Sequence, residues 1–423
     1  MNRLLRWLIL SLLPWSAASS SSGDLLRVLV AVEPSPLTYV AGYANRFQAL
    51  LSYLVHVDAD VEVVTAECVH PDPPKLYLGR VPIHYSRGFR FPWYRQLSLA
   101  FDWTGVLWRR VHAFRPQILH ATTPGLLWVP TLIASRFFGI PLVLSYHTHL
   151  PVYCRSYLHP FISRVAEWVI WKLLWLVHSC GDVTLVTSPQ IQDELEEHGI
   201  PSRVWPKGID TDRFHPSFRN ETLRESWLAG QKEYIVLYVG RMAAEKRLLD
   251  LVPILERLPV AQLVMVGDGP QRKQLSQSLA HQNPLWLGTL SGDALSQAYA
   301  SADVFVLPSD SETLGFVVLE SLASGVPVVA CNAGGVPDLI QDGVTGYLIE
   351  RGNESRWIER IDSLGGNPDL RASMGKLGRD SVAPFTWNSS MERVYREFYV
   401  EAREKAQQRW WGRPSTKQGA PDL

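Results

Sequence analysis

The sequence has little that would support a disulfide framework, a metal site or a nucleic-acid interface. Its four cysteines, Cys68, Cys154, Cys180 and Cys331, are scattered and show no CxxC spacing, which excludes a disulfide framework and a cysteine-ligated metal. The 41 basic and 41 acidic side chains cancel, so the totals give no support for nucleic acid as a partner. We therefore expect no metal, no nucleic-acid partner and reduced cysteines.

Two further absences narrow the class of protein. The N-terminal apolar run Trp7–Leu13 is too short to span a bilayer. No G-x-G-x-x-G pattern follows the first predicted strand, at residues 26–32, which argues against a nicotinamide-dependent dehydrogenase. What is present is a chain of 423 residues with 46% apolar and 19% charged side chains, which is typical of a globular protein of two domains.

Residues 1–23 have the pattern of a targeting segment. Arg3 and Arg6 form a positive start, Trp7–Leu13 an apolar core, and residues 16–18 a small-residue cleavage pattern. We expect a cleaved signal, with an uncleaved anchor or an unusual transit peptide as the alternatives.

Strands alternate with helices in two blocks of the chain. The first block, residues 24–208, has predicted strands at 26–32, 61–65, 118–120, 142–146 and 183–186. The second block, residues 233–386, has them at 235–239, 263–266, 285–288, 304–307 and 328–330. This alternation predicts an α/β fold with two Rossmann-like domains facing a cleft. We expect residues 209–232 to be a linker, 387–406 a terminal helix and 407–423 a mobile tail.

Ligands of such sheets bind beyond the carboxyl ends of the strands. In the first block the residues at these ends are Glu33, Gly42, His120, His147 and Ser188. Gly42 lies where the backbone could approach a phosphate. His147 could bond a sugar hydroxyl or a developing charge, although a structural role is the usual one for a lone histidine. His149 could compete for that role, but no third residue has metal-ligand spacing.

The most informative stretch is residues 303–342, a βαβ unit with glycine-rich loops of the kind that holds phosphates at helix N-termini. Glu312 lies in the loop after the first strand, where a donor sugar would lie; the alternative is an acid favoured by the helix dipole. Glu320 lies on the following helix among apolar residues, so its carboxylate needs a partner. The Glu320 carboxylate could bind the hydroxyls of a ribose. The alternative is an ordinary solvated carboxylate on a helix.

Two cations follow a strand of the second block. Arg241 and Lys246 are five positions apart and could stabilise a leaving diphosphate without a metal. Backbone amides of residues 313–316 would add to the same field. The alternative is a pair of ordinary surface cations. Residues 267–270, GDGP, are by themselves only a weak turn signal.

Two regions combine aromatic residues with a basic or helical pattern. Residues 75–115 contain one acidic residue, Asp102, and many basic and aromatic side chains. This composition suits contact with an anionic membrane surface or, equally, a solvated face over core aromatics. The basic residues are Lys75, Arg80, Arg87, Arg90, Arg95, Arg109, Arg110 and Arg115, and the aromatic residues are Phe89, Phe91, Trp93, Tyr94, Trp103 and Trp108. Trp168, Trp171 and Trp175 recur at helical spacing, which favours a core stripe over a lipid-facing helix. Trp410 and Trp411 could touch a membrane interface.

Five motifs of the second block occur in the order and spacing of the family-4 retaining glycosyltransferases of GT-B fold. They are Gly240-Arg241…Lys246, Gly267-Asp268-Gly269-Pro270, Ser309-x-x-Glu312-x-x-Gly315-Phe316-x-x-x-Glu320, Gly325-Val326-Pro327-Val328-Val329-Ala330 and Gly334-Gly335-x-Pro337-Asp338. Motifs of the first block resemble the sulfoquinovosyltransferases of plants, algae and cyanobacteria; they include Glu33-Pro34-Ser35-Pro36, Gly42-Tyr43-x-Asn45-Arg46-Phe47, Phe91-Pro92-Trp93-Tyr94, Ser145-Tyr146-His147-Thr148-His149 and Trp205-x-Lys207-Gly208. The resemblance covers residues 27–387.

The resemblance implies a GT-B fold whose C-terminal helix packs back toward the N-terminal domain. It also implies transfer of sulfoquinovose from UDP-sulfoquinovose to diacylglycerol, with the anomeric configuration retained by same-face attack. In the family, the residues matching Arg241 and Lys246 hold the diphosphate, the acid matching Glu320 binds ribose, the acid matching Glu312 contacts the sugar and the histidine matching His147 lies near it. The donor-binding set implied is Gly42, Gly240, Arg241, Lys246, Gly267, Leu314, Gly315, Phe316 and Glu320.

The resemblance implies no required cofactor, and the sequence does not indicate Mg²⁺. It implies peripheral membrane association and a plastid membrane, reached through the signal, with the endomembrane system as the alternative. Two departures are Ala41, where a small hydroxyl residue is expected before Gly42, and Phe316, where this subgroup often has Leu. Three other functions stay open: a glycosyltransferase with another sugar donor and phosphatidylinositol or diacylglycerol as acceptor, a nucleotide-sugar isomerase, and a non-catalytic binding module.

Overall fold

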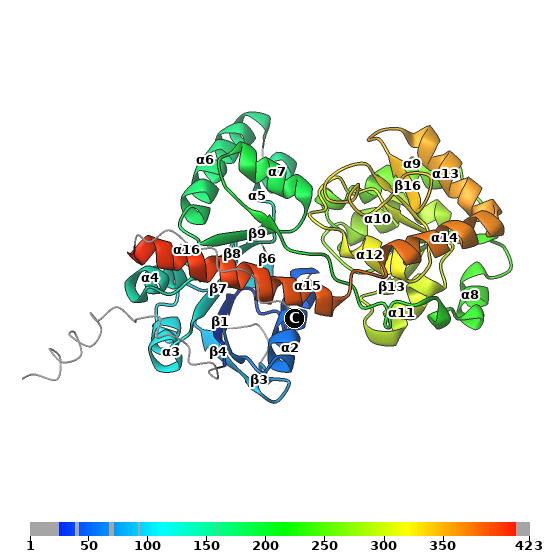
Figure 1. The fold of residues 1–423 in the computed structure, drawn as a ribbon. Coiled ribbons are helices and arrows are strands. Elements are labelled where there is room, and N and C mark those ends of the chain that lie inside the picture. Colours follow the sequence, from blue (N-terminus) through cyan, green and yellow to red (C-terminus); the bar gives the residue numbers. More distant parts are fainter. Residues whose placement is uncertain (1–24, 39–41, 67–71, 92–93, 158, 412–423) are drawn as a thin grey trace, which may run out of the picture.

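The chain folds into two α/β domains, each built on a parallel sheet with helices on its faces (Figure 1). The structure, a computed structural model, describes residues 25–38, 42–66, 72–91, 94–157 and 159–411. The predicted targeting segment at residues 1–23 lies outside the described residues, as do Ala41 and Trp93. The prediction of two Rossmann-like domains is confirmed.

The first domain contains a sheet of eight strands. Their spatial order is β10 (Arg203–Val204), β9 (Val183–Val186), β8 (Leu142–Tyr146), β7 (Ile118–Thr123), β1 (Arg27–Val32), β2 (Asp60–Ala66), β4 (Val81–Ser86) and β3 (Leu76–Tyr77). Neighbouring strands are parallel except β3 and β4. Nearly all residues of the central strands β1, β7 and β8 are buried, because helices cover both faces of a parallel sheet. The order of the strands reverses between β1 and β7, which is where such sheets bind ligands.

Six helices and one hairpin complete the first domain among the described residues. The helices are α2 (Gly42–His56), α3 (Val106–Phe114), α4 (Trp128–Phe138), α5 (Leu150–Tyr157), α6 (Pro160–His178) and α7 (Pro189–Glu197). The hairpin joins β5 (Phe89–Phe91) to β6 (Tyr94–Leu99). The apolar stripe of α2, with Phe47, Leu50 and Leu54 fully buried, packs on the sheet and fixes the helix start near the second domain.

The second domain contains a fully parallel sheet of six strands. Their order is β13 (Leu285–Gly288), β12 (Ala261–Val266), β11 (Tyr234–Val239), β14 (Val304–Leu307), β15 (Val328–Cys331) and β16 (Gly346–Ile349). Here the order reverses between β11 and β14. The helices of this domain are α8 (Glu221–Leu228), α9 (Leu251–Glu256), α10 (Arg272–Ser278), α11 (Gly292–Ala300), α12 (Phe316–Ala323), α13 (Glu354–Gly366) and α14 (Pro368–Val382). Short 3₁₀ turns are η1 (Pro216–Phe218), η2 (Ala244–Lys246), η3 (Leu248–Asp250) and η4 (Ala280–Gln282).

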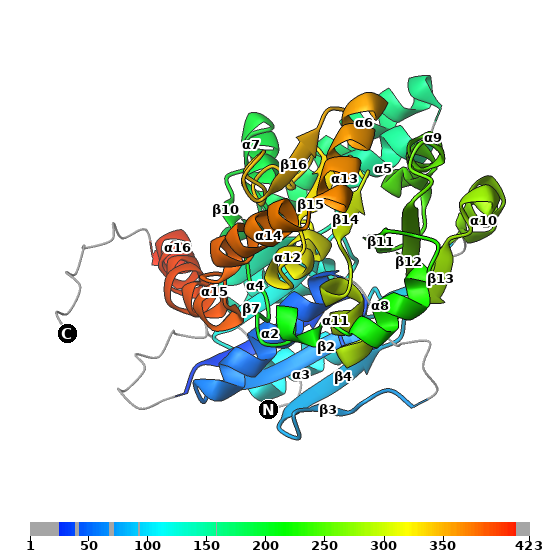
Figure 2. The ribbon, with the colours of Figure 1, turned by 90° about the vertical axis from the view of Figure 1, so that its right-hand side faces the viewer.

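The chain crosses between the domains twice, and the two crossings run side by side. The Ile209 amide donates to the Phe385 carbonyl at 2.7 Å. After the second crossing the chain forms one terminal helix from α15 (Trp387–Arg393), a π-helical segment η5 (Val394–Phe398) and α16 (Tyr399–Trp411). This helix runs along the first domain, with α15 nearer to the second domain and α16 further from it (Figures 1 and 2). The expectation that the C-terminal helix packs back toward the N-terminal domain is therefore confirmed.

Two predicted boundaries are wrong. The expected linker, residues 209–232, is part of the second domain, because Ile209, Phe214 and Trp227 are buried in its core. A buried ion pair at 3.0 Å between Arg224 and Asp303 also fixes this segment. The segment is mostly polar, which led to the prediction of a linker, but its few large apolar side chains determine how it packs. The terminal helix continues to Trp411, five residues past its predicted end at 406, so the start of the expected mobile tail is helical.

The tryptophans of α6 differ in their surroundings. Trp171 is buried, with 8% of its surface exposed, whereas Trp168 and Trp175 are 63% and 47% exposed. The prediction of a core stripe is therefore correct for Trp171 and wrong for the other two. Periodicity places a residue on a helix, but it does not say whether the outer face is covered. Within the described ranges, no helix is both long and apolar enough to cross a membrane.

Candidate active site

The second domain gathers charged residues where its strand order reverses. Lys246 lies in η2, just after β11, and Glu312 lies in the loop after β14. Because β11 and β14 are neighbours, these loops meet, and the Lys246 ammonium lies 2.6 Å from a Glu312 carboxylate oxygen. Both side chains are mostly buried. The ion pair therefore holds a cation and a carboxylate in one fixed arrangement at the edge where ligands bind.

Arg241 lies at the same edge of the sheet. Its guanidinium is 3.7 Å from the buried carboxylate of Glu245 and remains partly exposed. The strand ends beneath it approach closely: a Cβ on Gly267 would lie 2.0 Å from the Gly240 carbonyl oxygen. A side chain at Gly267 would therefore push the two loops apart. Gly240 and Gly267 thus bring loops together, which places the Arg241 backbone beside β12.

The N-terminus of α12 lies against the first domain, because its first residue, Phe316, packs beside Gly42. Gly315 caps it with φ +82°, a conformation that other residues rarely adopt. The amides of the first helical turn have no partner within a helix, so this end favours an anion. Leu314 is 2% exposed and packs in the core, so only its backbone is available to a ligand. Phe316, the first residue of α12, contacts the first domain.

Glu320 is buried on α12 and has the partner that its apolar surroundings require. The Tyr299 hydroxyl, on α11, donates to a Glu320 carboxylate oxygen at 2.8 Å. Burial raises the pKa of Glu320 to about 7, against the opposing effects of the Tyr299 hydrogen bond and the charge of Arg213. The carboxylate is thus positioned by one hydrogen bond and retains acceptor sites for a further donor.

The first domain contributes an aromatic cluster around His147. The His147 amide donates to the Thr123 carbonyl at 3.1 Å, which fixes the start of the loop after β8. Its half-buried ring lies 5.4 Å from the Phe47 ring and 5.6 Å from the Trp205 ring, measured between centroids. Burial, with smaller effects from Arg46 and His120, lowers the pKa of His147 well below its usual range. The ring is therefore neutral at physiological pH and acts as a hydrogen-bonding group.

The two domains touch at Gly42 and Phe316. A Cβ on Gly42 would lie 2.7 Å from the Phe316 ring, so only glycine permits this approach. Helix α2 begins at Gly42, so its N-terminus points at the second domain. A hydrogen bond of 3.1 Å from the Thr187 hydroxyl to the Thr313 carbonyl also joins the domains. In this structure Gly42 is therefore in contact with the Phe316 ring of the second domain.

Four other candidates of the first domain have structural partners. The Glu33 carboxylate accepts from the amides of Ala100, Leu126 and Leu127. Ser188 caps α7, and His149 pairs with Glu194 at 2.9 Å. The prediction that His120 ends its strand is wrong: β7 continues to Thr123, and His120 Nδ1 lies 3.0 Å from the Tyr399 hydroxyl of the terminal helix. Of the strand-end candidates, Gly42 and His147 are the two that reach the second domain or the aromatic cluster beside it.

No role was predicted for Arg46 from the sequence, although the structure places it at this boundary. Its guanidinium is fully buried, 5.2 Å from the Trp205 ring centroid and 5.5 Å from that of Phe316. None of its three nitrogens has a hydrogen-bond partner among the described residues. Burial lowers the pKa of Arg46 to about 9. The available signal was its place on the apolar stripe of α2, four residues before Leu50, where a charged residue is unexpected.

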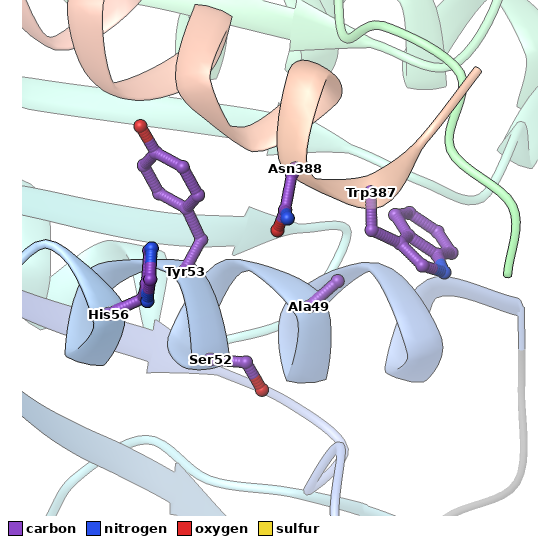
Figure 3. Close-up of a pocket in the computed structure, with 6 residues that line it drawn as sticks. All are labelled: Ala49, Ser52, Tyr53, His56, Trp387 and Asn388. Carbon is purple, nitrogen blue, oxygen red and sulfur yellow. The ribbon is translucent and has the colours of Figure 1, made fainter. Parts of the chain in front are cut away.

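The described residues contain no group of three side chains suited to hold a metal ion. Two surface pockets lie away from the charged loops. One, of about 330 Å³, lies between α2 and α15 and is lined by Ala49, Ser52, Tyr53, His56, Trp387 and Asn388 (Figure 3). The other, of about 350 Å³, lies beside α6 and is lined by Trp168, Trp171, Lys172, Trp175 and His198. Neither includes a predicted site residue.

Two family patterns match the chain. The family described as Glycosyltransferase Family 4 matches residues 40–213, and the family described as Glycosyl transferases group 1 matches residues 219–381. Sulfoquinovosyl transferase SQD2 of Arabidopsis thaliana is 37% identical over 384 residues, which are 89% of this chain and 74% of that protein. A GDP-mannose-dependent alpha-mannosyltransferase of Mycobacterium tuberculosis is 36% identical over 336 residues, 77% of this chain and 84% of that protein.

Solved structures share the fold at lower sequence identity. Sucrose-phosphate synthase from Thermosynechococcus elongatus superposes with a TM-score of 0.76 at 20% identity, covering 89% of this chain and 100% of that one. Anabaena HepE in complex with UDP and glucose superposes with a TM-score of 0.70 at 18% identity, covering 88% of this chain and 99% of that one. The expectation of a GT-B fold is confirmed.

Proposed function

This chain belongs to the family-4 glycosyltransferases of GT-B fold, and on that premise we propose that it transfers sulfoquinovose from UDP-sulfoquinovose to diacylglycerol. The observation that carries the proposal is the 37% identity to a sulfoquinovosyl transferase across 89% of the chain. HepE, which has the same fold, binds UDP and glucose, which supports a nucleotide sugar as donor. A hexosyltransferase of this family needs sites for a nucleotide, a sugar and an acceptor.

The nucleotide is assigned to the second domain. Arg241, Lys246 and the first amides of α12 would neutralise the diphosphate as the glycosidic bond breaks, when its negative charge is greatest. Glu320 would accept hydrogen bonds from the ribose hydroxyls, with Tyr299 holding the carboxylate from its other side. No metal is needed in this arrangement, because two cations and a helix N-terminus supply the positive field.

The sugar is assigned to the boundary between the domains. Glu312, which is held by Lys246, would contact the sugar, and neutral His147 would bond it from the first domain. In the transfer the bond between C1 and the diphosphate oxygen breaks, and C1 bonds to the acceptor oxygen on the same face. The proton of the acceptor hydroxyl passes to the departing diphosphate oxygen. The configuration at C1 is retained without a covalent enzyme intermediate.

The acceptor is a lipid, and α6 of the first domain offers a surface for a bilayer. Apolar side chains along this helix are exposed, and Arg164 and Lys172 lie among them, as in helices that bind anionic membrane surfaces. The exposed apolar residues are Phe161, Ile162, Val165, Trp168, Val169, Leu173, Trp175 and Leu176. A plastid membrane is the proposed location, supported by the N-terminal targeting pattern and the plant relative.

The test is a mass spectrum of the lipid formed with diacylglycerol vesicles. UDP-sulfoquinovose, UDP-glucose and GDP-mannose are offered side by side, because a mannosyltransferase is 36% identical over 77% of the chain. We expect sulfoquinovosyl diacylglycerol as the main product. Exclusive use of a neutral donor would overturn the choice of sugar. Consumption of the donor without any lipid product would instead favour an isomerase.

A further inference from the structure

Two arginines of this protein are buried to a similar degree but differ in their partners. Arg224 is 7% exposed and pairs with Asp303 at 3.0 Å. Arg46 is fully buried, and its Nε, Nη1 and Nη2 have no hydrogen-bond partner among the described residues. A buried guanidinium without a carboxylate or hydrogen bonds is strongly unfavourable. A ligand that supplied these hydrogen bonds would remove the cost.

The surroundings of Arg46 leave an anion as the natural partner. Trp205 and Phe316 place aromatic rings within 5.5 Å of its guanidinium carbon. Rings stabilise the charge weakly and satisfy none of its N–H groups. Burial is the cause of its lowered pKa, and no acidic side chain in the described ranges opposes that effect. His147 Nε2, in the same cluster, is also buried without a hydrogen-bond partner there.

Arg46 also lies where the two halves of the active site meet. Phe316 contacts it from the second domain and is the first residue of α12, the helix assigned to the diphosphate. Gly42, one turn before Arg46 on α2, touches the same ring. Because Phe316 belongs to the other domain, its ring would move away from the guanidinium if the two domains separated, and a ligand bound between them could then reach Arg46.

We propose that the Arg46 guanidinium binds the sulfonate group of the donor sugar. This inference rests on the proposed function, because a neutral hexose carries no group that would pair with it. A sulfonate is a permanent anion with three acceptor oxygens, and two of them match the planar fork of a guanidinium. His147 Nε2 is placed to bond the same sugar. Arg46 is thus a specificity-determining residue that separates sulfoquinovose from uncharged sugars.

The test measures donor selectivity in Arg46→Met. Methionine fills similar space and removes the charge. We expect kcat/KM for UDP-sulfoquinovose to fall by about 10- to 100-fold, the range for loss of charge-assisted hydrogen bonds. The dissociation constant of UDP alone, measured by calorimetry, should change by less than about twofold, because UDP carries no sulfonate. The ratio of UDP-glucose to UDP-sulfoquinovose turnover should rise.

Arg46→Lys is the second variant, and it separates charge from geometry. It retains the positive charge but lacks the fork, so we expect an intermediate loss. Arg80→Met is the matched control: Arg80 is exposed on the same domain and pairs with Asp58, and its removal should leave donor selectivity unchanged. Arg46→Met should melt no lower than the wild type, because it removes an uncompensated buried charge. If Arg46→Met fails to fold, the donor selectivity of Arg46→Lys tests the proposal instead.

The outcomes distinguish this inference from the proposed function. A wild-type protein that does not use UDP-sulfoquinovose overturns both. If the wild type uses that donor, an unchanged selectivity in both Arg46 variants overturns the role of Arg46 alone. Equal losses in the affinities for UDP and for UDP-sulfoquinovose would also overturn it, because they would show that Arg46 serves only the packing of the two domains.

Discussion

The two domains present different kinds of polar groups to each other. On the second domain the charges are already paired: Lys246 with Glu312, and Glu320 with the Tyr299 hydroxyl. On the first domain Arg46 and His147 are buried with nitrogens that lack hydrogen-bond partners among the described residues. The first arrangement is preorganised and stable without a ligand. For the second we propose that a substrate entering between the domains supplies the missing partners.

This difference teaches which part of a substrate each side recognises. Preorganised charges suit a group common to all donors, such as the diphosphate and ribose of a nucleotide. Unsatisfied buried groups suit the part that distinguishes one substrate from another, because a wrong ligand leaves them unpaired. We therefore assign general donor binding to the second domain and sugar discrimination to the first. The predictions below test that division.

The largest expected effect is on the second domain, from Lys246→Ala or Arg241→Ala. Each should lower kcat by about 10²-fold or more, because a cation facing the leaving diphosphate acts mainly in the transition state. Lys246→Ala also leaves the Glu312 carboxylate without its partner. Steady-state kinetics with all usable donors should show similar losses for each.

The control for these variants is Lys232→Ala, whose ammonium bonds the Pro259 carbonyl on the surface. It should retain wild-type turnover. If kcat falls by less than about threefold in both Lys246→Ala and Arg241→Ala, these cations have no part in the mechanism. The assignment of general donor binding to the second domain would then lose its support.

A smaller effect is expected where the two sides touch. Gly42→Val places methyl groups against the Phe316 ring, which a single Cβ would already approach to 2.7 Å. We expect about a tenfold loss in kcat/KM, because the domains no longer close fully. Phe316→Leu shortens the opposing side chain and should restore part of the loss in the double variant. Purely additive losses in the double-mutant cycle would show that this contact does not couple the domains.

The pH dependence of donor binding tests the second domain alone. Burial raises the pKa of Glu320 from 4.5 to about 7, so the carboxylate that we propose binds ribose is protonated at lower pH. We expect KM for the UDP-sugar to rise about tenfold from pH 8 to pH 6, following one protonation. Glu320→Gln should raise KM at pH 8 and abolish this dependence. A wild-type profile that is flat over this range would contradict the assignment.

The same pKa shift has a consequence for stability. Because the folded state binds the Glu320 proton more tightly than the unfolded state, the unfolding free energy falls as pH rises from about 4.5 to about 7. The contribution is fully present below 4.5 and lost above 7. Glu320→Gln should lack this slope, so its melting temperature relative to wild type should be higher at pH 8 than at pH 5.

The smallest effect concerns the outer surface of the first domain. Replacing Trp168 and Trp175 by Ser should weaken partitioning onto anionic vesicles several-fold, by about 5-fold or more, because both rings are exposed on α6. Arg87→Ser should have a smaller, salt-dependent effect. Trp286→Ser on the second domain is the comparison variant and should not change partitioning. Unchanged binding in the α6 variant would assign membrane contact to another surface.

The second domain was more predictable from sequence than the first. Strands of both domains were predicted with their observed bounds, 142–146 and 183–186 in the first and 285–288 and 304–307 in the second. What distinguishes the second domain is that Arg241, Lys246 and Glu312 lie together at the predicted edge. The reason is physical: these loops follow adjacent parallel strands, so strand order alone brings them together. The need of Glu320 for a partner also followed from its apolar neighbours, although Tyr299 as that partner did not.

The first domain depended on contacts between distant segments. Arg46 is buried by Trp205 and by Phe316 of the other domain, and neither neighbour follows from the pattern of α2. Glu33 and His120 looked like site residues because they lie near strand ends, yet backbone amides hold the Glu33 carboxylate and the Tyr399 hydroxyl bonds His120 Nδ1. The edge strands β3 and β10 were missed because two residues are too few to show periodicity.

The terminal helix has a consequence for the order in which the chain is completed. Met391, Phe398 and Tyr399 belong to the core of the first domain, packed with residues such as Val30 and Leu51. During synthesis the first domain emerges first, but these core residues leave the ribosome only after the entire second domain. The domain that is made first is therefore finished last, and until then its His120 lacks the hydroxyl that it meets in the native protein.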